Sequence, residues 1–260
     1  DTDSVVTYQI TGGTDGARFA VNSTTGVLTF SGFIPDFENP LFSNDNDYEV
    51  TVTASDGTNT TDQTITVSVN DLNDNAPVFA DVNYDISIVE NTKGPTLLET
   101  TDADAGSTVT YSLSGADAAD FEIVNNTLAL KEAADFETKS SYAVTVTASD
   151  GLNSTTQAVT YTITDANDNA PVFTSNAAVS IDENTTDVVT LVTTDADTSQ
   201  EVTYSITGGA DADKFNLSSS GALSLKAAPN YESLAFDGNL VYQVTVKADD
   251  GINTANQTIA

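Results

Sequence analysis

One nine-residue stretch occurs twice in the chain, as Asp71-Leu-Asn-Asp-Asn-Ala-Pro-Val-Phe79 and as Asp165-Ala-Asn-Asp-Asn-Ala-Pro-Val-Phe173. Four of its first five residues in each copy carry side-chain oxygens and little bulk. The Ala-Pro pair that follows stops a helix, and the Val-Phe pair begins an apolar segment. We therefore expect each copy to place a set of oxygen donors immediately before a β-strand.

The residue types that are missing narrow the chemistry of such a segment. The sequence has no Cys, Met, Trp or His. Thiol nucleophiles, disulfides, histidine bases and the nitrogen and sulfur ligands that zinc and copper prefer are therefore excluded. Oxygen remains, and oxygen ligands select calcium or magnesium.

The net charge limits the classes of molecule that the chain can bind. Lys and Arg total 7 against 39 Asp and Glu, which gives a formal net charge of -32. Nucleic acid and anionic membranes are poor partners for such a chain, and cations are good ones. We find no nucleophile-base pair or cofactor motif that would indicate an enzyme. No apolar run could span a bilayer and no signal peptide leads the chain, so we expect a segment of a longer polypeptide that does not insert into a membrane.

A strand-like alternation of apolar and polar residues occurs three times, beginning at Tyr48, Tyr142 and Tyr242. Such a run turns one face to a core and the other to water, so each tyrosine is expected to pack in a core. Each run ends in an Asp-Gly turn that leads into a Thr-rich strand.

The equivalent turn residues Asp56, Asp150 and Asp250 lie 94 and 100 residues apart. A repeat of that length, with about seven short strands per unit and no helical pattern, predicts an all-β fold of tandem β-sandwiches. The linkers fall at the two Asn-Asp-Asn-Ala-Pro stretches, which divides the chain into residues 1–72, 73–167 and 168–260. The first unit lacks its opening strands.

Short acidic motifs occupy matching places in the units. In the second unit they are Glu90, Asp102-Ala-Asp104, Asp135-Phe-Glu137, Asp150 and the exit stretch 165–169. None of the motifs contains Lys or Arg. Two carboxylates at roughly 5 Å repel by about 3 kcal/mol at an effective dielectric constant near 20. If these motifs converge, the joint between units must bind cations, take up protons or open.

The complete set of motifs resembles that of a cadherin repeat, and the resemblance covers the whole chain. Its components are a Glu near the first strand, then Asp-x-Asp, Asp-x-Glu, Ala-x-Asp and the Asp-x-Asn-Asp-Asn-Ala-Pro linker. The resemblance implies Greek-key sandwiches of seven strands that follow one another in an end-to-end rod. It also implies up to three Ca²⁺ ions at each complete junction between repeats.

The resemblance further implies the ligands at each junction. At the first junction they are Asp36, Glu38, the carbonyls of Leu72 and Asn75, the side chains of Asn73 and Asp74, and Asp102, Asp104 and Asp150. At the second junction they are Glu90, Asp135, Glu137, the carbonyls of Ala166 and Asn169, the side chains of Asn167 and Asp168, and Asp195, Asp197 and Asp250. Asp71 and Asp165 belong to the motif but are not included among the ligands.

The two junctions are not expected to be equal. The first lacks a glutamate corresponding to Glu90, so its outermost ion should bind more weakly or not at all. Two half-sites, which we expect to bind metal poorly, remain at the ends: Asp1, Asp3 and Asp56 at one, and Asn230 with Glu232 at the other.

The function implied by the resemblance is that of a calcium-dependent adhesive and structural segment of a large extracellular or cell-surface protein. Its adhesive partner, protein or glycan, is not specified. Without Trp, the strand exchange of vertebrate adhesion cadherins is not expected. The richness in Asp, Thr and Ala with little Lys resembles the cadherin-like repeats of giant bacterial adhesins, which predicts a bacterial origin.

A carbohydrate-binding module is the alternative function. Its candidate sites are the loops at residues 39–47 and 233–240, with Phe42, Phe236 and Tyr242 as aromatic contacts. The absence of Trp argues against a flat aromatic platform for sugar. Strong glycan binding by a single isolated repeat would favour this alternative.

Overall fold

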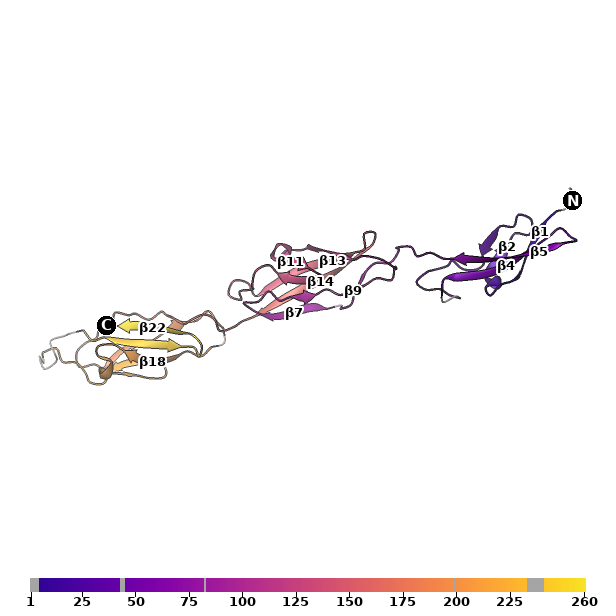
Figure 1. Ribbon diagram of the computed structural model, residues 1–260. Helices are drawn as coiled ribbons and strands as arrows, with labels where there is room; N and C mark the ends of the chain where they lie inside the picture. Colours follow the sequence, from indigo (N-terminus) through magenta and orange to yellow (C-terminus); the bar gives the residue numbers. More distant parts are fainter. Residues whose placement is uncertain (1–4, 43–44, 82, 199, 233–240) are drawn as a thin grey trace.

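The computed structural model describes residues 5–42, 45–81, 83–198, 200–232 and 241–260. Its strands form three groups in a row, and the first and third groups lie at opposite ends of an elongated molecule (Figure 1). Every sheet draws its strands from one group alone. The expected divisions after residues 72 and 167 fall in the segments between groups. The prediction of an all-β rod of sandwiches is confirmed.

Some of the sequence-based expectations concern residues that lie outside the described ranges. They are Asp1 and Asp3 of one half-site, residues 43 and 44 of the loop at residues 39–47, and the loop at residues 233–240, which contains Phe236. Among the described residues, no helix combines the length and the apolar character that a membrane span requires.

The second group is a sandwich of one four-stranded and one three-stranded sheet with a short additional pair. The sheets have the strand orders β10-β13-β14-β7, β11-β12-β8 and β6-β9. Since β6 with β7 and β8 with β9 are each one interrupted strand, seven strands result. Their bounds are β6 (Val78–Phe79), β7 (Tyr84–Val89), β8 (Thr96–Leu97), β9 (Thr100–Thr101), β10 (Thr110–Ser114), β11 (Phe121–Val124), β12 (Thr127–Leu130), β13 (Ser141–Ser149) and β14 (Ser154–Thr164).

The other two groups follow the same plan. In the first group, sheets β1-β4-β5 and β2-β3 correspond to β10-β13-β14 and β11-β12. The bounds are β1 (Thr7–Gly12), β2 (Phe19–Val21), β3 (Leu28–Phe30), β4 (Asp47–Ser55) and β5 (Thr60–Ser68). The third group contains β15 (Val172–Phe173), β16 (Asp187–Thr190), β17 (Thr193–Thr194), β18 (Thr203–Gly208), β19 (Phe215–Leu217), β20 (Ala222–Leu225), β21 (Val244–Asp249) and β22 (Thr254–Ile259).

The period-two pattern of the sequence produces the cores. Along β13 the side chains of Val144, Val146 and Ala148 are 3%, 0% and 0% exposed, whereas the residues between them are only partly buried. Full burial of a large apolar side chain contributes about 1.5–3 kcal/mol. Tyr48 is buried as expected, while Tyr142 and Tyr242 are half-buried at the margins of their cores. The long strand is thus the centre of each unit.

Each group also contains a short 3-10 helix where the sequence predicts only a turn. These are η1 (Gly16–Arg18), η2 (Ala118–Asp120) and η3 (Ala212–Lys214). A three-residue helix is too short to produce a periodic pattern of apolar residues. The aspartate before each helix accepts a backbone N–H of the long-strand region, namely that of Glu49 (3.0 Å), Ala143 (2.7 Å) or Gln243 (2.9 Å).

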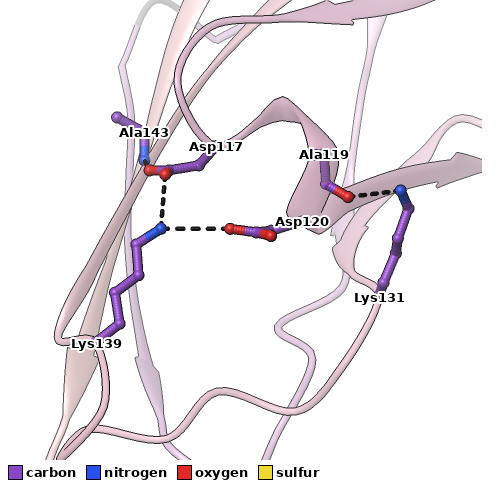
Figure 2. A network of polar contacts seen from close by, with 6 residues as sticks. All are labelled: Asp117, Ala119, Asp120, Lys131, Lys139 and Ala143. Atoms are coloured by element: carbon purple, nitrogen blue, oxygen red, sulfur yellow. Dashed lines mark hydrogen bonds and ion pairs between the residues drawn. The ribbon is translucent and has the colours of Figure 1, made fainter.

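Figure 2 shows this contact in the second unit, where Asp117 lies between the Ala143 amide and the Lys139 ammonium group. The Lys139 Nζ atom is 2.6 Å from Asp117 Oδ1 and 3.3 Å from Asp120 Oδ2. The hydrogen bond from Lys139, together with that from the Ala143 amide, lowers the pKa of Asp117. The ionised form of Asp117 is therefore the one that stabilises the fold.

Asp117→Asn is expected to lower the free energy of unfolding of the second unit at pH 7 by about 1 kcal/mol, because the ion pair is partly exposed. A depressed pKa contributes stability that is present above the unfolded value and lost as the pH falls through the folded value. The difference from the parent should therefore shrink below about pH 4. Urea unfolding at pH 7 and pH 3 measures it. Asp120→Asn is the control and should have a smaller effect; equal stability of Asp117→Asn and the parent at pH 7 would contradict the assignment.

Candidate metal centres at the junctions

The first linker is hydrogen-bonded to the unit that follows it. Asp71 Oδ2 accepts the backbone N–H of Ala105 at 2.6 Å. The Asn75 backbone N–H donates to Asp104 Oδ2 at 3.0 Å, and its side-chain Nδ2 donates to Asp104 Oδ1 at 2.8 Å. Both oxygens of the buried Asp104 carboxylate are thereby fixed by the linker.

The second linker repeats these contacts at equivalent positions. Asp165 Oδ2 accepts the Thr198 backbone N–H at 2.7 Å and also the Thr198 hydroxyl group. Asn169 donates to Asp197 from its backbone N–H at 3.0 Å and from Nδ2 at 2.9 Å. The agreement indicates that the nine-residue motif, together with the Asp-Ala-Asp motif of the following unit, recurs with one geometry at both junctions.

The linker side chain at the third motif position contacts the Asp-Gly turn of the following unit. Asn153 Nδ2 donates to Asn73 Oδ1 at 2.8 Å, and Asn253 Nδ2 donates to Asn167 Oδ1 at 2.7 Å. Within the turn, Asp150 Oδ1 accepts the N–H groups of residues 152 and 153, each at 2.7 Å. This leaves the second oxygen of Asp150 for another partner.

The unit before the second linker also holds it. Glu90 follows β7 and is only 3% exposed. Its Oε1 accepts the Ala166 N–H at 2.7 Å and its Oε2 accepts the Phe136 N–H at 2.8 Å. The next residue, Asn91, has a positive φ of 62° and donates from Nδ2 to Asp168 Oδ2 at 2.5 Å. The second linker is thus bound on both sides.

These contacts bring carboxylates into close groups at both junctions. In each group, one oxygen from every member lies within 4.8 Å of the others. The groups are Glu38, Asp71 and Asp104; Asp102, Asp104 and Asp150; Glu90, Asp135 and Glu137; Glu137, Asp165 and Asp197; and Asp195, Asp197 and Asp250. Asp104, Glu137 and Asp197 each belong to two groups, so the groups at a junction are continuous.

Several carboxylate oxygens in these groups are buried and have no hydrogen-bond partner among the described residues. They are Glu38 Oε1, Asp71 Oδ1, Asp102 Oδ2, Asp150 Oδ2, Asp165 Oδ1, Asp195 Oδ2 and Asp250 Oδ2. The Asp250 side chain is particularly informative, because the residue is only 7% exposed. A buried, unpaired carboxylate oxygen is costly, and a cation is the partner that would satisfy several of them together.

The electrostatic environment differs within a junction. Burial and the neighbouring Asp71 raise the pKa of Glu38. Burial and the nearby charges of Glu90, Asp168 and Asp197 raise the pKa of Glu137. Each junction therefore contains a glutamate whose ionisation is opposed by its surroundings.

At the Asp-Gly turns, hydrogen bonds lower the pKa of the carboxylate instead of raising it. Burial opposes ionisation of Asp150 and Asp250, but the hydrogen bonds that each receives from its own turn outweigh burial and lower both pKa values. The linker asparagine adds a further hydrogen bond to each. These two carboxylates are therefore held in the charged form that a cation requires.

Lysine side chains are engaged elsewhere. Lys139 pairs with the aspartates at η2, Lys214 pairs with Asp211 at η3, and Lys247 pairs with Asp249. Lys131 and Lys226 donate to backbone carbonyls at 2.6 Å and 2.7 Å. The acid groups at the junctions are consequently left for a cation from solution, and a donor set made only of oxygen suits Ca²⁺.

Most of the side chains expected from the sequence are brought together by the structure, and the set also gains two members. Asp71 and Asp165, which the sequence-based ligand set omits, each lie in a close group with one unpaired oxygen. Their presence at the first position of both motif copies was the available signal. Among the described residues, the close groups do not include Asp36, Asp74 or Asp168.

The remaining predicted ligands lie along the linkers and their margins. Asp36 Oδ1 accepts the N–H groups of Glu38 at 3.1 Å and Asn39 at 3.0 Å, so it caps its own loop. Leu72 is exposed, and the N–H of Ala166 is bound by Glu90. The role of these residues and of the Asn75 and Asn169 carbonyls stays a prediction.

Comparisons with known proteins point to one family. A scan against models of protein families finds none that matches the chain. Human Protocadherin Fat 1 is 33% identical over 265 residues, which cover 95% of this chain and 6% of that protein. Human Protocadherin Fat 4 is 35% identical over 133 residues, which cover 48% of this chain and 2% of that protein. The chain thus spans only a small part of the length of these relatives.

Solved structures agree with the sequence relatives. The structure titled Protocadherin gammaB7 EC3-6 cis-dimer has a TM-score of 0.76 and 26% sequence identity, and the match covers 99% of this chain and 64% of that chain. Mouse Cadherin-23 EC22-24 has a TM-score of 0.75 at 24% identity and covers 98% of this chain and 84% of that chain, which supports the fold. Together with the motif order and the strand plan, these findings show that the chain belongs to the cadherin repeat family.

Proposed function

We propose that the chain is a calcium-dependent structural segment of an extracellular adhesion protein, in which Ca²⁺ at the junctions makes a row of repeats rigid. The observation that carries the proposal is the recurrence, at both junctions, of buried and unpaired carboxylate oxygens within continuous acidic groups. Up to three ions are proposed for a complete junction. A hydrolytic function is not supported, since the acidic groups recur at each joint and the relatives are cadherins.

The proposed ligand set combines the sequence motifs with the structure. At the first junction it comprises Asp36, Glu38, Asp71, Asp102, Asp104 and Asp150, the side chains of Asn73 and Asp74, and the carbonyls of Leu72 and Asn75. At the second it comprises Glu90, Asp135, Glu137, Asp165, Asp195, Asp197 and Asp250, the side chains of Asn167 and Asp168, and the carbonyls of Ala166 and Asn169.

The linker and the two units that it joins would have different roles at a joint. The linker and the following unit are joined by neutral and charge-assisted hydrogen bonds, such as those of Asn75 with Asp104. The unit before the linker contributes glutamates whose ionisation is opposed, Glu38 and Glu137. Bound Ca²⁺ would supply the positive charge that lets these glutamates and the aspartates of the next unit remain close. Without it, repulsion favours separation on the side of the preceding unit.

Calcium suits this donor set better than magnesium does. Ca²⁺ accepts six to eight oxygens in flexible geometry, whereas Mg²⁺ requires a tight octahedron and retains its waters. We propose an affinity in the range of extracellular modules, with a dissociation constant of about 10⁻⁴ to 10⁻³ M. Ion binding to the folded joint alone would stabilise it in proportion to the logarithm of calcium concentration.

The wider context is also proposed rather than established. We propose a cell-surface or extracellular location and an adhesive role, which the likeness to cadherins supports. The bacterial origin stays a prediction. The carbohydrate-binding alternative is not favoured by the relatives, and Phe42 of its candidate loop packs against Phe33 and beneath Arg18.

Chelation of calcium is expected to reduce the maximum dimension of the molecule and to widen its range of conformations in solution. The acidic joints should bend when their charges are uncompensated. Small-angle scattering in calcium and then in chelator should show a fall in the maximum dimension and a rise in flexibility. Calorimetric titration should give between three and six Ca²⁺ ions per chain, of which the second junction takes up to three. Identical scattering curves in the two conditions would contradict calcium-rigidified joints.

Asp168→Ala is expected to raise the calcium concentration needed at the second junction by about tenfold or more, since a charged oxygen ligand is lost. Asp74→Ala is the matched variant and should affect the first junction alone. Both variants should leave the folds of the units intact, because both side chains lie on exposed linker positions. Limited proteolysis of the linkers across a calcium series, with thermal unfolding, measures both effects. Cooperative unfolding of the whole chain in either variant would contradict independent units.

A further inference from the structure

We propose that Asn153 and Asn253 are positioning residues, each of which orients the amide of a linker asparagine, Asn73 or Asn167, so that the amide oxygen is available to the calcium site. This inference rests on the proposed function, which supplies the calcium ion. It adds a role for two side chains that lie outside the proposed ligand set.

The contact is direct and occurs twice. Asn153 Nδ2 donates to Asn73 Oδ1 at 2.8 Å across 80 residues of sequence. Asn253 Nδ2 donates to Asn167 Oδ1 at 2.7 Å across 86 residues. Both donors sit three residues after the aspartate of an Asp-Gly-x-Asn turn, beside the acidic groups of Asp150 or Asp250.

Acceptor-only groups fix which way these amides point. Asn153 Nδ2 also lies 3.4 Å from the Asn73 carbonyl oxygen, and Asn253 Nδ2 lies 3.4 Å from that of Asn167. A carbonyl cannot donate, so the NH₂ end of the turn asparagine must face the linker. The linker amide must then present its oxygen to that NH₂ group.

The other end of the linker amide is fixed in the same manner. Asn167 Nδ2 lies 3.2 Å from Asp250 Oδ1, a carboxylate oxygen that can only accept when ionised. The linker amide is therefore held in one of its two possible orientations without any metal.

This orientation has a consequence for a cation. An amide oxygen carries two lone pairs, so Oδ1 of Asn167 can accept from Asn253 and still offer a lone pair to a metal. The reversed amide would bring its NH₂ group against the NH₂ group of Asn253 and its oxygen against the Asp250 carboxylate, and both contacts are unfavourable. Fixing the orientation in advance also removes part of the entropy cost of assembling the site.

The first unit provides an internal control. Its turn carries the same asparagine, Asn59, at the equivalent position. There the Asn59 Nδ2 group donates to Asp56 Oδ2 of its own turn at 3.3 Å. The Asp-Gly turn of the first unit therefore forms with its asparagine bonded within the turn, whereas Asn153 and Asn253 also reach a linker asparagine.

The test uses the full 260-residue chain with spin-label pairs across each junction, since the sequence contains no Cys. Thr66→Cys with Ser112→Cys reports on the first junction, and Thr162→Cys with Ser205→Cys on the second, all at exposed strand positions. The distance distribution for each pair is followed by pulsed electron resonance from chelator to saturating Ca²⁺.

Asn153→Ala should raise the calcium midpoint of the first junction by about five- to tenfold and leave the second unchanged. Asn253→Ala should do the reverse, and Asn59→Ala should change neither. In chelator, Asn153→Ala should also broaden the distance distribution of the first pair, which is a readout that needs no metal.

A double-mutant cycle separates positioning from a local effect on the turn. If Asn153 acts through Asn73, then Asn73→Ala should raise the first midpoint, and adding Asn153→Ala to it should raise it little further. Full additivity of the two changes would overturn the inference, as would a normal midpoint in Asn153→Ala beside a raised one in Asn73→Ala. No response of the parent chain to calcium would instead overturn the proposed function, and this inference with it.

Discussion

Repulsion among carboxylates held a few ångströms apart is the constraint on which the rest of the molecule depends. The fold brings acids from three places, the end of one unit, the linker and the start of the next, into continuous groups. Sandwich cores on either side fix the strands whose ends lead into the loops and turns that carry these acids, so the groups cannot disperse without moving whole units. Burial then leaves carboxylate oxygens without hydrogen-bond partners. The relative placement of the two units at a joint therefore depends on whether cations from solution balance the charge.

The hydrogen bonds of each linker are not shared equally between the two units that it joins. Asn75 with Asp104 and Asn169 with Asp197 bind each linker to the unit that follows. The contacts with the preceding unit differ between the two junctions, since Glu90 of the preceding unit binds only the second linker. A linker is thus best regarded as an extension of the next repeat, and the acidic face that it presents backward is what a cation would close.

The few basic side chains belong to a separate part of the design. In the second and third units Lys139 and Lys214 lie at the 3-10 helices, where they pair with the aspartates that also bind the long-strand region. Lys247 pairs with Asp249 at the end of β21. The positive charges of these three lysines are therefore paired within units, and two of them hold a helix to the sheet. This separation keeps the joints acidic while each sandwich retains its own internal ion pairs.

The sequence alone determined the all-β class and the repeat, because strand periodicity and motif order are local properties. The linkers and the set of acids that should meet were predictions, and the acids came from the resemblance of the motifs to those of a cadherin repeat. The sequence showed no sign of the 3-10 helices, since three residues produce no period. Tertiary structure decided that Asp71 and Asp165 join the acidic groups and that Asn153 and Asn253 reach the linkers across 80 and 86 residues. Such pairings depend on how consecutive units are placed end to end, and no local pattern of residues specifies that distance or orientation.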